Sequence, residues 1–108
     1  MSVYHEIKWM YQRVRYGYDD TFLWDIGYSV AELLDKTLPK YFENMNGYPS
    51  YIGSMDEWRA IIREIIDGMQ AARKLNEYDF SKENLEELVN KADKGMLLFA
   101  KYYRDIWD

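Results

Sequence analysis

The stretch from Ser54 to Leu75, SMDEWRAIIREIIDGMQAARKL, decides the fold. It opens with Ser54 and Glu57 at the spacing of a capping box, in which both side chains accept hydrogen bonds from backbone N–H groups at a helix start. Apolar residues then return every three or four positions, which predicts a deeply packed helix with Gly68 as its one weak point. This apolar stripe consists of Trp58, Ile61, Ile62, Ile65, Ile66, Met69, Ala72 and Leu75.

The segment that follows predicts another helix, which runs almost to the chain end. Ser81 is placed to cap it, and Phe80 is placed to pack against Leu85 as a hydrophobic staple. We also expect Trp107 to pack, either near Trp24 or across an interface between subunits, because a tryptophan on a frayed end would be unusual. The apolar period of this last helix is kept by Leu85, Leu88, Val89, Ala92, Met96, Phe99, Ala100 and Tyr103.

The beginning of the chain predicts a first helix from Val3 to Tyr16 that stops at Gly17. Glycine is common just past a helix end because it adopts left-handed backbone without steric cost. The apolar positions of this helix fall at helical intervals. They are Val3, Ile7, Met10 or Tyr11, and Val14.

A second helix is predicted to begin where Asp19 or Asp20 caps it and to extend to Met45. Pro39 must end, kink or restart this helix, because a proline inside a helix loses a hydrogen bond and clashes with the preceding turn. Residues 46–53, NGYPSYIG, form the one clear loop. With no strand alternation in the sequence, the predicted fold is an all-α bundle of about four main helices.

Length and composition favour a single helical domain over residues 1–108, since no linker divides the chain. Apolar residues make up 48% and charged residues 31%, a balance typical of soluble folded proteins. No run approaches the roughly 20 apolar residues that cross a bilayer, and the first residues lack the apolar core of a secretion signal. We therefore expect an intracellular protein without a membrane partner. The absence of cysteine excludes disulfides and thiolate chemistry.

The charge is unevenly distributed along the chain. The net charge is −5, yet residues 1–18 carry Lys8, Arg13 and Arg15 against Glu6 and so sum to +2. Extended binding to DNA or RNA needs many basic contacts, which this acidic chain does not offer. A single small anion remains a suitable ligand for the basic N-terminal segment, residues 1–18.

Rings and cations alternate on the first predicted helix. Residues three or four apart share a helix face. Rings can stack on a nucleobase and cations can pair with phosphate, so this composition suits a nucleotide ligand. The alternative is that arginines simply lie over neighbouring rings of an aromatic-rich core. One line comprises Trp9, Arg13 and Tyr16, and the other comprises Tyr4, Lys8, Tyr11, Arg15 and Tyr18.

The two arginines of this helix are predicted to differ. Arg13 and Arg15 point ~200° apart on a helix, so they reach one ligand together only at a helix end or a subunit boundary. We expect one of them to pair with Asp19 or Asp20, which we interpret as capping or arginine-pairing residues and not as catalytic ones.

Two carboxylate pairs raise a metal hypothesis. Glu32 with Asp35, and Glu64 with Asp67, each share a helix face on which a divalent cation could bridge them, as in all-α nucleotide pyrophosphatases of the MazG type. The pairs fall mainly opposite the apolar stripes, so a solvated surface is the preferred interpretation. His5 is likewise interpreted as a polar surface residue. We predict no catalytic residue, no metal and no cofactor.

Three blocks of the sequence resemble a widespread family of small bacteriophage proteins. The blocks are RVRYGYDDTFLWDIGYSVA at residues 13–31, MDEW at residues 55–58 and YYRDIWD at residues 102–108. The family is identified as the anti-CBASS nucleotide sponges, helical oligomers that sequester the cyclic dinucleotides used as alarm signals in bacterial defence. The resemblance implies a phage immune-evasion protein in the cytoplasm of the infected host. It would bind a signal such as cyclic GMP-AMP without hydrolysing it.

The resemblance also implies which residues hold the ligand. Arginines would neutralise the phosphates, and tyrosine and tryptophan rings would sandwich the bases. The ligand-binding residues predicted on this basis are Trp9, Arg13, Arg15, Tyr16, Tyr18, Trp24, Tyr28 and Arg104.

The aromatic content predicts more apolar surface than one subunit can hide, and hence a homo-oligomer, either a dimer or a tetramer. Two other functions stay open. One is a phage protein that inhibits or organises a host protein through its aromatic surface. The other is a magnesium-dependent nucleotide hydrolase that uses the carboxylate pairs.

Overall fold

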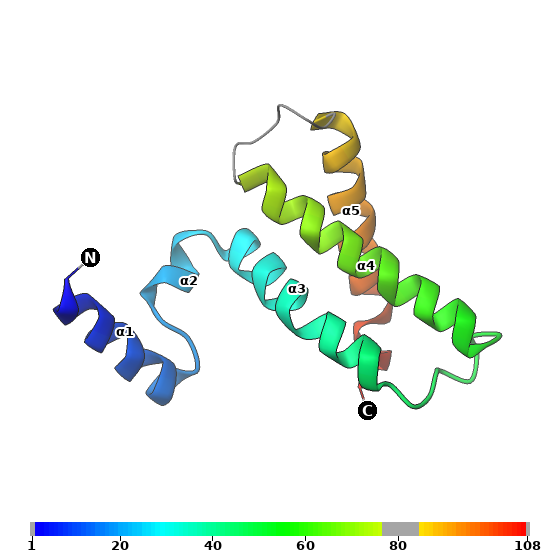
Figure 1. Ribbon diagram of the computed structural model, residues 1–108, viewed down its shortest axis with the longest axis horizontal. Helices are drawn as coiled ribbons and strands as arrows, with labels where there is room; N and C mark the ends of the chain where they lie inside the picture. Colours follow the sequence, from blue (N-terminus) through cyan, green and yellow to red (C-terminus); the bar gives the residue numbers. More distant parts are fainter. Residues whose placement is uncertain (1, 77–84, 108) are drawn as a thin grey trace. The chain divides into compact units, whose positions relative to one another are not determined.

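A computed structural model describes residues 2–76 and 85–107 of the chain (Figure 1). Most of the described residues are helical and none forms a strand, which confirms the predicted all-α class. The predicted Ser81 cap and Phe80 staple lie outside the described residues. The helices are α1 (Val3–Tyr16), α2 (Asp20–Trp24), α3 (Ile26–Asn44), α4 (Met55–Asn76) and α5 (Leu85–Tyr102), followed by the 3₁₀ helix η1 (Tyr103–Asp105).

The chain divides into two compact units. The smaller unit is Met1–Val30 and the larger unit is Ala31–Asp108. That residues 1–108 form one domain stays a prediction.

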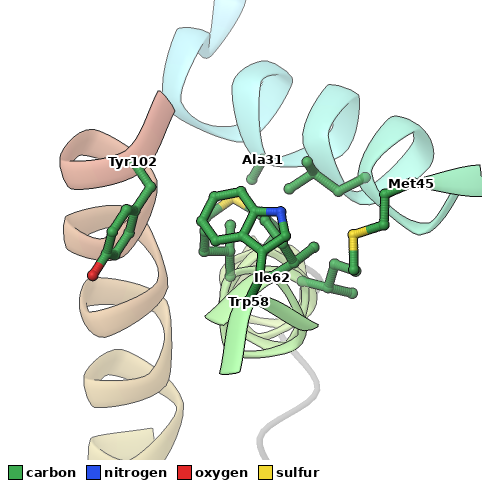
Figure 2. Packing of buried hydrophobic residues seen from close by; sticks show 9 residues of the cluster. Ala31, Met45, Trp58, Ile62 and Tyr102 are labelled. Atoms are coloured by element: carbon green, nitrogen blue, oxygen red, sulfur yellow. The ribbon is translucent and has the colours of Figure 1, made fainter. Parts of the chain in front are cut away.

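The core of the larger unit forms around α4. Trp58 and Ile62 are completely covered, and Ala31 and Met45 from the α3 side and Tyr102 of α5 are buried against them (Figure 2). The Trp58 indole meets the edge of the Tyr102 ring, with the ring centroids 5.7 Å apart. Because α4 contributes most of the fully buried side chains, the stripe read from the sequence is the centre of this unit. Those side chains are Trp58, Ile62, Ile65, Ile66 and Met69.

The start of α4 shows the predicted capping box with one variation. The Ser54 hydroxyl accepts a hydrogen bond from the Glu57 N–H at 3.2 Å. The Glu57 carboxylate accepts one from the N–H of Gly53 at 3.1 Å, one residue before the usual partner. Both side chains thus satisfy backbone donors that the helix itself leaves without acceptors.

Gly68 has a packing role that its weak helix propensity conceals. A Cβ atom built on Gly68 would lie 2.6 Å from the Cα of Gly95 and 2.7 Å from the carbonyl oxygen of Lys91, both in α5. A Cβ on Gly95 would lie 2.7 Å from the Cα of Gly68. The backbones of α4 and α5 therefore touch where these two glycines face each other. Figure 1 shows the two helices crossing. Gly68, which was predicted to be the weak point of its helix, is thus the residue that allows the two helices to approach closely.

The helix expected from Asp20 to Met45 is two helices, which corrects the predicted position of its break. The break lies at Asp25, whose backbone is extended, and α3 continues through Pro39 to Asn44. The Asp25 carboxylate accepts a hydrogen bond from the Tyr28 N–H at 3.0 Å and thereby caps α3. The loss of one hydrogen bond at Pro39 does not end a helix that is buried at Ala31 and Leu38.

The smaller unit begins as predicted. Ser2 caps α1, and Gly17 ends it with a left-handed backbone at φ 82°. The Gly17 N–H donates to the carbonyl oxygen of Arg13 at 3.0 Å. Asp19 then caps α2 through a 2.9 Å hydrogen bond from the Thr21 N–H.

Candidate functional site

The candidate site is the aromatic–basic corner of the smaller unit. We use this name for seven of the eight residues predicted to bind ligand: Trp9, Arg13, Arg15, Tyr16, Tyr18, Trp24 and Tyr28. Four of them lie on α1, and the others lie in the turn after it, at the end of α2 and at the beginning of α3. The eighth, Arg104, belongs to the larger unit.

The α1–α2 turn is held by Asp19, which is buried. The Asp19 carboxylate accepts hydrogen bonds from the Thr21 hydroxyl and N–H and from the Arg13 guanidinium, whose Nη1 lies 2.5 Å away. These donors, the Thr21 hydroxyl first, keep the pKa of Asp19 below its ordinary value, against the opposing effect of burial. Asp19 is therefore an anionic anchor of the turn.

Asp20 ties the same turn to α1 from a second direction. The Gln12 side chain donates to the Asp20 carboxylate at 3.0 Å and accepts from the Asp20 N–H at 2.9 Å. Lys8 Nζ lies 3.3 Å from the same carboxylate. Asp19 thus caps a helix and pairs with an arginine, as predicted. Asp20 instead pairs with Lys8 and Gln12 and caps no described helix.

Arg13 and Arg15 have different surroundings, which confirms the structural part of the prediction. Arg13 pairs with Asp19 through its Nη1, which leaves its other N–H donors on an exposed side chain. Arg15 forms no salt bridge with any residue in the described ranges, and its guanidinium carbon lies 5.5 Å from the centre of the Tyr16 ring. Arg15 is the arginine that remains available to an anion.

The rings of the corner form two groups. Trp9 meets the edge of Trp24, with centroids 5.7 Å apart; Trp9 is buried, whereas Trp24 is exposed. The Tyr16 and Tyr18 rings are 6.4 Å apart at 42°, and both are exposed. Tyr28 is half-buried. Exposed rings beside an unneutralised guanidinium offer stacking surfaces and a phosphate partner together.

Arg104 and Trp107 lie at the end of the larger unit. The Arg104 guanidinium carbon lies 5.8 Å from the Tyr103 ring centre, and Arg104 is exposed. Trp107 is 75% exposed, so its side chain does not pack into the larger unit. Packing of Trp107 near Trp24 or across a subunit interface stays a prediction.

A cavity of about 260 Å³ in the larger unit was missed by sequence reasoning. The hydroxyl of Tyr51 donates a hydrogen bond to the carboxylate of Asp105, and this bond is the main reason why the pKa of Tyr51 is raised to about 12. The loop of residues 46–49 was visible in the sequence, but its proximity to the chain end was not. The cavity is lined by Tyr41, Met45, Asn46, Gly47, Tyr48, Pro49, Asp105 and Trp107.

Three of the four carboxylates considered for metal binding lie next to cations of the protein. Arg73 Nη1 lies 2.7 Å from Asp35, and its Nη2 lies 3.8 Å from Glu32. Glu64 lies 3.5 Å from Lys94 Nζ. Among the described residues, no three His, Cys, Asp or Glu side chains are grouped so that they could hold a metal ion. A metal at Glu32 and Asp35 would have to displace Arg73.

His5 is exposed, as predicted, and its Nδ1 lies 2.6 Å from the Ser2 hydroxyl. Its ring also lies 5.8 Å from that of Trp9. His5 thus belongs to the capped start of α1, and its ring borders the aromatic–basic corner at Trp9.

Comparison with protein-family models, with curated proteins and with solved structures finds no match to this chain. None of the described helices is both long enough and apolar enough to cross a membrane.

Proposed function

We propose that the protein binds and sequesters a cyclic dinucleotide, such as cyclic GMP-AMP, without hydrolysing it. In this proposal it is a phage immune-evasion protein that acts in the cytoplasm of the infected bacterium as a homo-oligomer. The observation that carries the proposal is the position of Arg15, which pairs with no described carboxylate and lies over the exposed ring of Tyr16. The exposed ring of Tyr18 lies 6.4 Å from that of Tyr16. A phosphate on the guanidinium would place an attached base within reach of a tyrosine face.

The roles of the other corner residues follow from their contacts. Arg13 is bonded to Asp19 and holds the turn in place, so its contribution to binding is mainly positional. Trp24 presents an exposed ring supported from behind by Trp9 and is a second stacking surface. Binding of this kind requires positioned rings and one or more cations, and no group that breaks a bond.

The deciding experiment is incubation with a panel of cyclic dinucleotides, followed by removal of free ligand, heat release and chromatography. We expect one or more ligands to be retained and released intact. Recovery of hydrolysed products would favour the magnesium-dependent hydrolase, and should then depend on added magnesium. Retention of no cyclic dinucleotide at micromolar concentration would contradict the proposal.

A matched pair of arginine variants tests the assignment of the site. Arg15→Ala should weaken ligand binding about tenfold to hundredfold, because a charged hydrogen bond to phosphate is lost. Arg59→Ala is the control: Arg59 is also exposed, and its guanidinium also lies 5.5 Å from a ring centre, that of Phe42. Both variants lose one charge and one cation–ring contact. Equal affinities of the two variants would place the ligand elsewhere.

A further inference from the structure

The apolar stripe of α1 is exposed. Its four residues Val3, Ile7, Met10 and Val14 are 69%, 62%, 59% and 84% exposed. The helix contacts the rest of its unit through another side, on which Trp9 is buried about 130° around the helix from this stripe. The amphipathic pattern of α1 therefore marks a face that the smaller unit does not cover.

The stripe has the spacing of a coiled-coil seam. Its residues follow one another at intervals of four, three and four positions, as the apolar positions of a heptad repeat do. Such a seam is complete only when a second helix packs along it. The residues beside the seam decide which helix fits and in which direction.

The borders of the seam are self-complementary. Glu6 and Arg13 lie along one border, and Tyr4 and Tyr11 lie along the other. In an antiparallel helix pair, the charged border of one copy lies beside the charged border of the other. Glu6 of each copy would therefore lie beside Arg13 of the other. In a pair of the same direction, the charged border would face the tyrosine border and no ion pair would form.

Both charged residues can take part in such a contact. Glu6 is exposed and forms no salt bridge with any residue that the structure describes. The Arg13 side chain is 53% exposed, and only its Nη1 is the donor to Asp19. A guanidinium has five N–H donors, so the others can reach a second carboxylate.

We propose that α1 pairs with α1 of a second copy of this chain in an antiparallel, two-fold symmetric arrangement. Val3 lies opposite Val14 of the second copy, and Ile7 lies opposite Met10. Antiparallel pairing also opposes the two helix dipoles favourably. The inference deepens the proposed self-association by naming its surface, and it does not depend on the identity of the ligand.

The size of α1 sets the strength of this contact. Its 14 residues are about 21 Å long, so one helix pair buries less than the roughly 1,200 Å² of a stable interface. We therefore expect an equilibrium between monomer and dimer that depends on protein concentration. Light scattering should show the mass rising above the 13.1 kDa of one chain as concentration increases.

Two variants locate the contact in that measurement. Ile7→Glu should weaken dimerisation at least about tenfold, because it would place unpaired charges inside the seam. Leu97→Glu is the control, since Leu97 is 72% exposed on α5 and lies outside the seam. Equal masses for the two variants and the natural protein, with circular dichroism unchanged, would overturn the proposal.

Cross-linking then tests the direction of pairing, and the natural absence of cysteine makes it unambiguous. Val3→Cys and Val14→Cys chains should form a mixed disulfide dimer when combined, and neither should cross-link alone. The same residue of the two copies, such as Val3 and Val3, would lie about 16 Å apart along an antiparallel pair, beyond the roughly 7 Å that a disulfide spans. Cross-linking of each variant alone would show parallel pairing and overturn the proposed geometry.

The remaining outcome is a protein that stays monomeric and gives no mixed dimer. That result would overturn the proposal and leave the stripe to a different partner, such as a host protein. Ligand retention is measured separately by heat release. A monomer that still retains a cyclic dinucleotide would contradict the pairing and the proposed homo-oligomer but not the proposed ligand binding. A dimer that retains none would contradict only the proposed ligand binding.

Discussion

The larger unit and the smaller unit are each stabilised internally by a different kind of contact. In the larger unit, α4 places five side chains in a core that solvent does not reach. In the smaller unit, Asp19 and Asp20 join α1 to α2 through hydrogen bonds and salt bridges, while the apolar stripe of α1 is exposed. Helical periodicity therefore identifies an apolar face, but it does not show whether the same chain covers that face.

The largest expected effect comes from replacing a tryptophan in each unit. Trp58→Ala should lower the free energy of unfolding by about 3–5 kcal/mol, because it empties the centre of the core. Trp24→Ala should cost far less, since the Trp24 ring is 70% exposed. Urea denaturation followed by circular dichroism measures both. Equal losses of stability would show that the smaller unit has a core of its own that the observed exposure does not reveal.

A second comparison concerns glycines. Gly68→Ala should destabilise by about 1–3 kcal/mol, because the new methyl group would overlap backbone atoms of α5 and force the helices apart. Gly27→Ala, in the smaller unit, would meet only the Asp25 carboxylate at 3.6 Å. Since alanine favours helix more than glycine does, Gly27→Ala should be neutral or stabilising by up to about 1 kcal/mol. Thermal melting distinguishes the two, and a harmless Gly68→Ala would contradict the close crossing.

Features set by local chemistry were predictable from sequence. Gly17 after α1, the Asp19 cap and the pairing of Ser54 with Glu57 each depend on residues a few positions apart, and the structure confirms them. Asp25 was missed because the apolar period continues across it. The preference of aspartate for helix starts was the signal that could have indicated this cap. In the structure, the Asp25 carboxylate accepts a hydrogen bond from the Tyr28 N–H.

Features set by contacts between distant segments were not predictable. The approach of Gly68 to Gly95 depends on how two helices cross, and the cavity beside Asp105 depends on where the chain end meets a loop. Within the candidate site, the sequence indicated that Arg13 and Arg15 differ but not which one pairs with an aspartate. The turn at Gly17 decides that, because it returns Asp19 toward Arg13.

The third expected effect is at that turn. Gly17→Ala should destabilise the smaller unit by about 1–2 kcal/mol, because a residue with a Cβ is strained at φ 82° even though no atom lies within 4 Å of the added methyl group. Hydrogen exchange at the Thr21 N–H reports the turn locally. The same substitution at Gly47, where the backbone is not left-handed and space is open, should leave this exchange unchanged. Unchanged exchange in Gly17→Ala would mean that the turn does not need the glycine.

The smallest expected effect is a pH dependence in the acid range at the α1–α2 turn of the smaller unit. The pKa of Asp19 lies below its ordinary value of 3.8 in the folded chain, because the Thr21 hydroxyl, the Arg13 guanidinium and the Thr21 N–H all favour the carboxylate over the acid. A group whose pKa is lowered by folding contributes its full stabilisation above the unfolded pKa and loses it as pH falls through the folded pKa. The α1–α2 turn should therefore be unaffected between pH 7 and about 5, and should weaken on acidification below about 4. Exchange and chemical shift of the Thr21 N–H, which donates to Asp19, follow this titration directly. Asp19→Asn should remove the dependence while keeping an oxygen acceptor in place. An acid transition of the Thr21 signal that persists in Asp19→Asn would assign the titration to another carboxylate and remove Asp19 as the anchor of the turn.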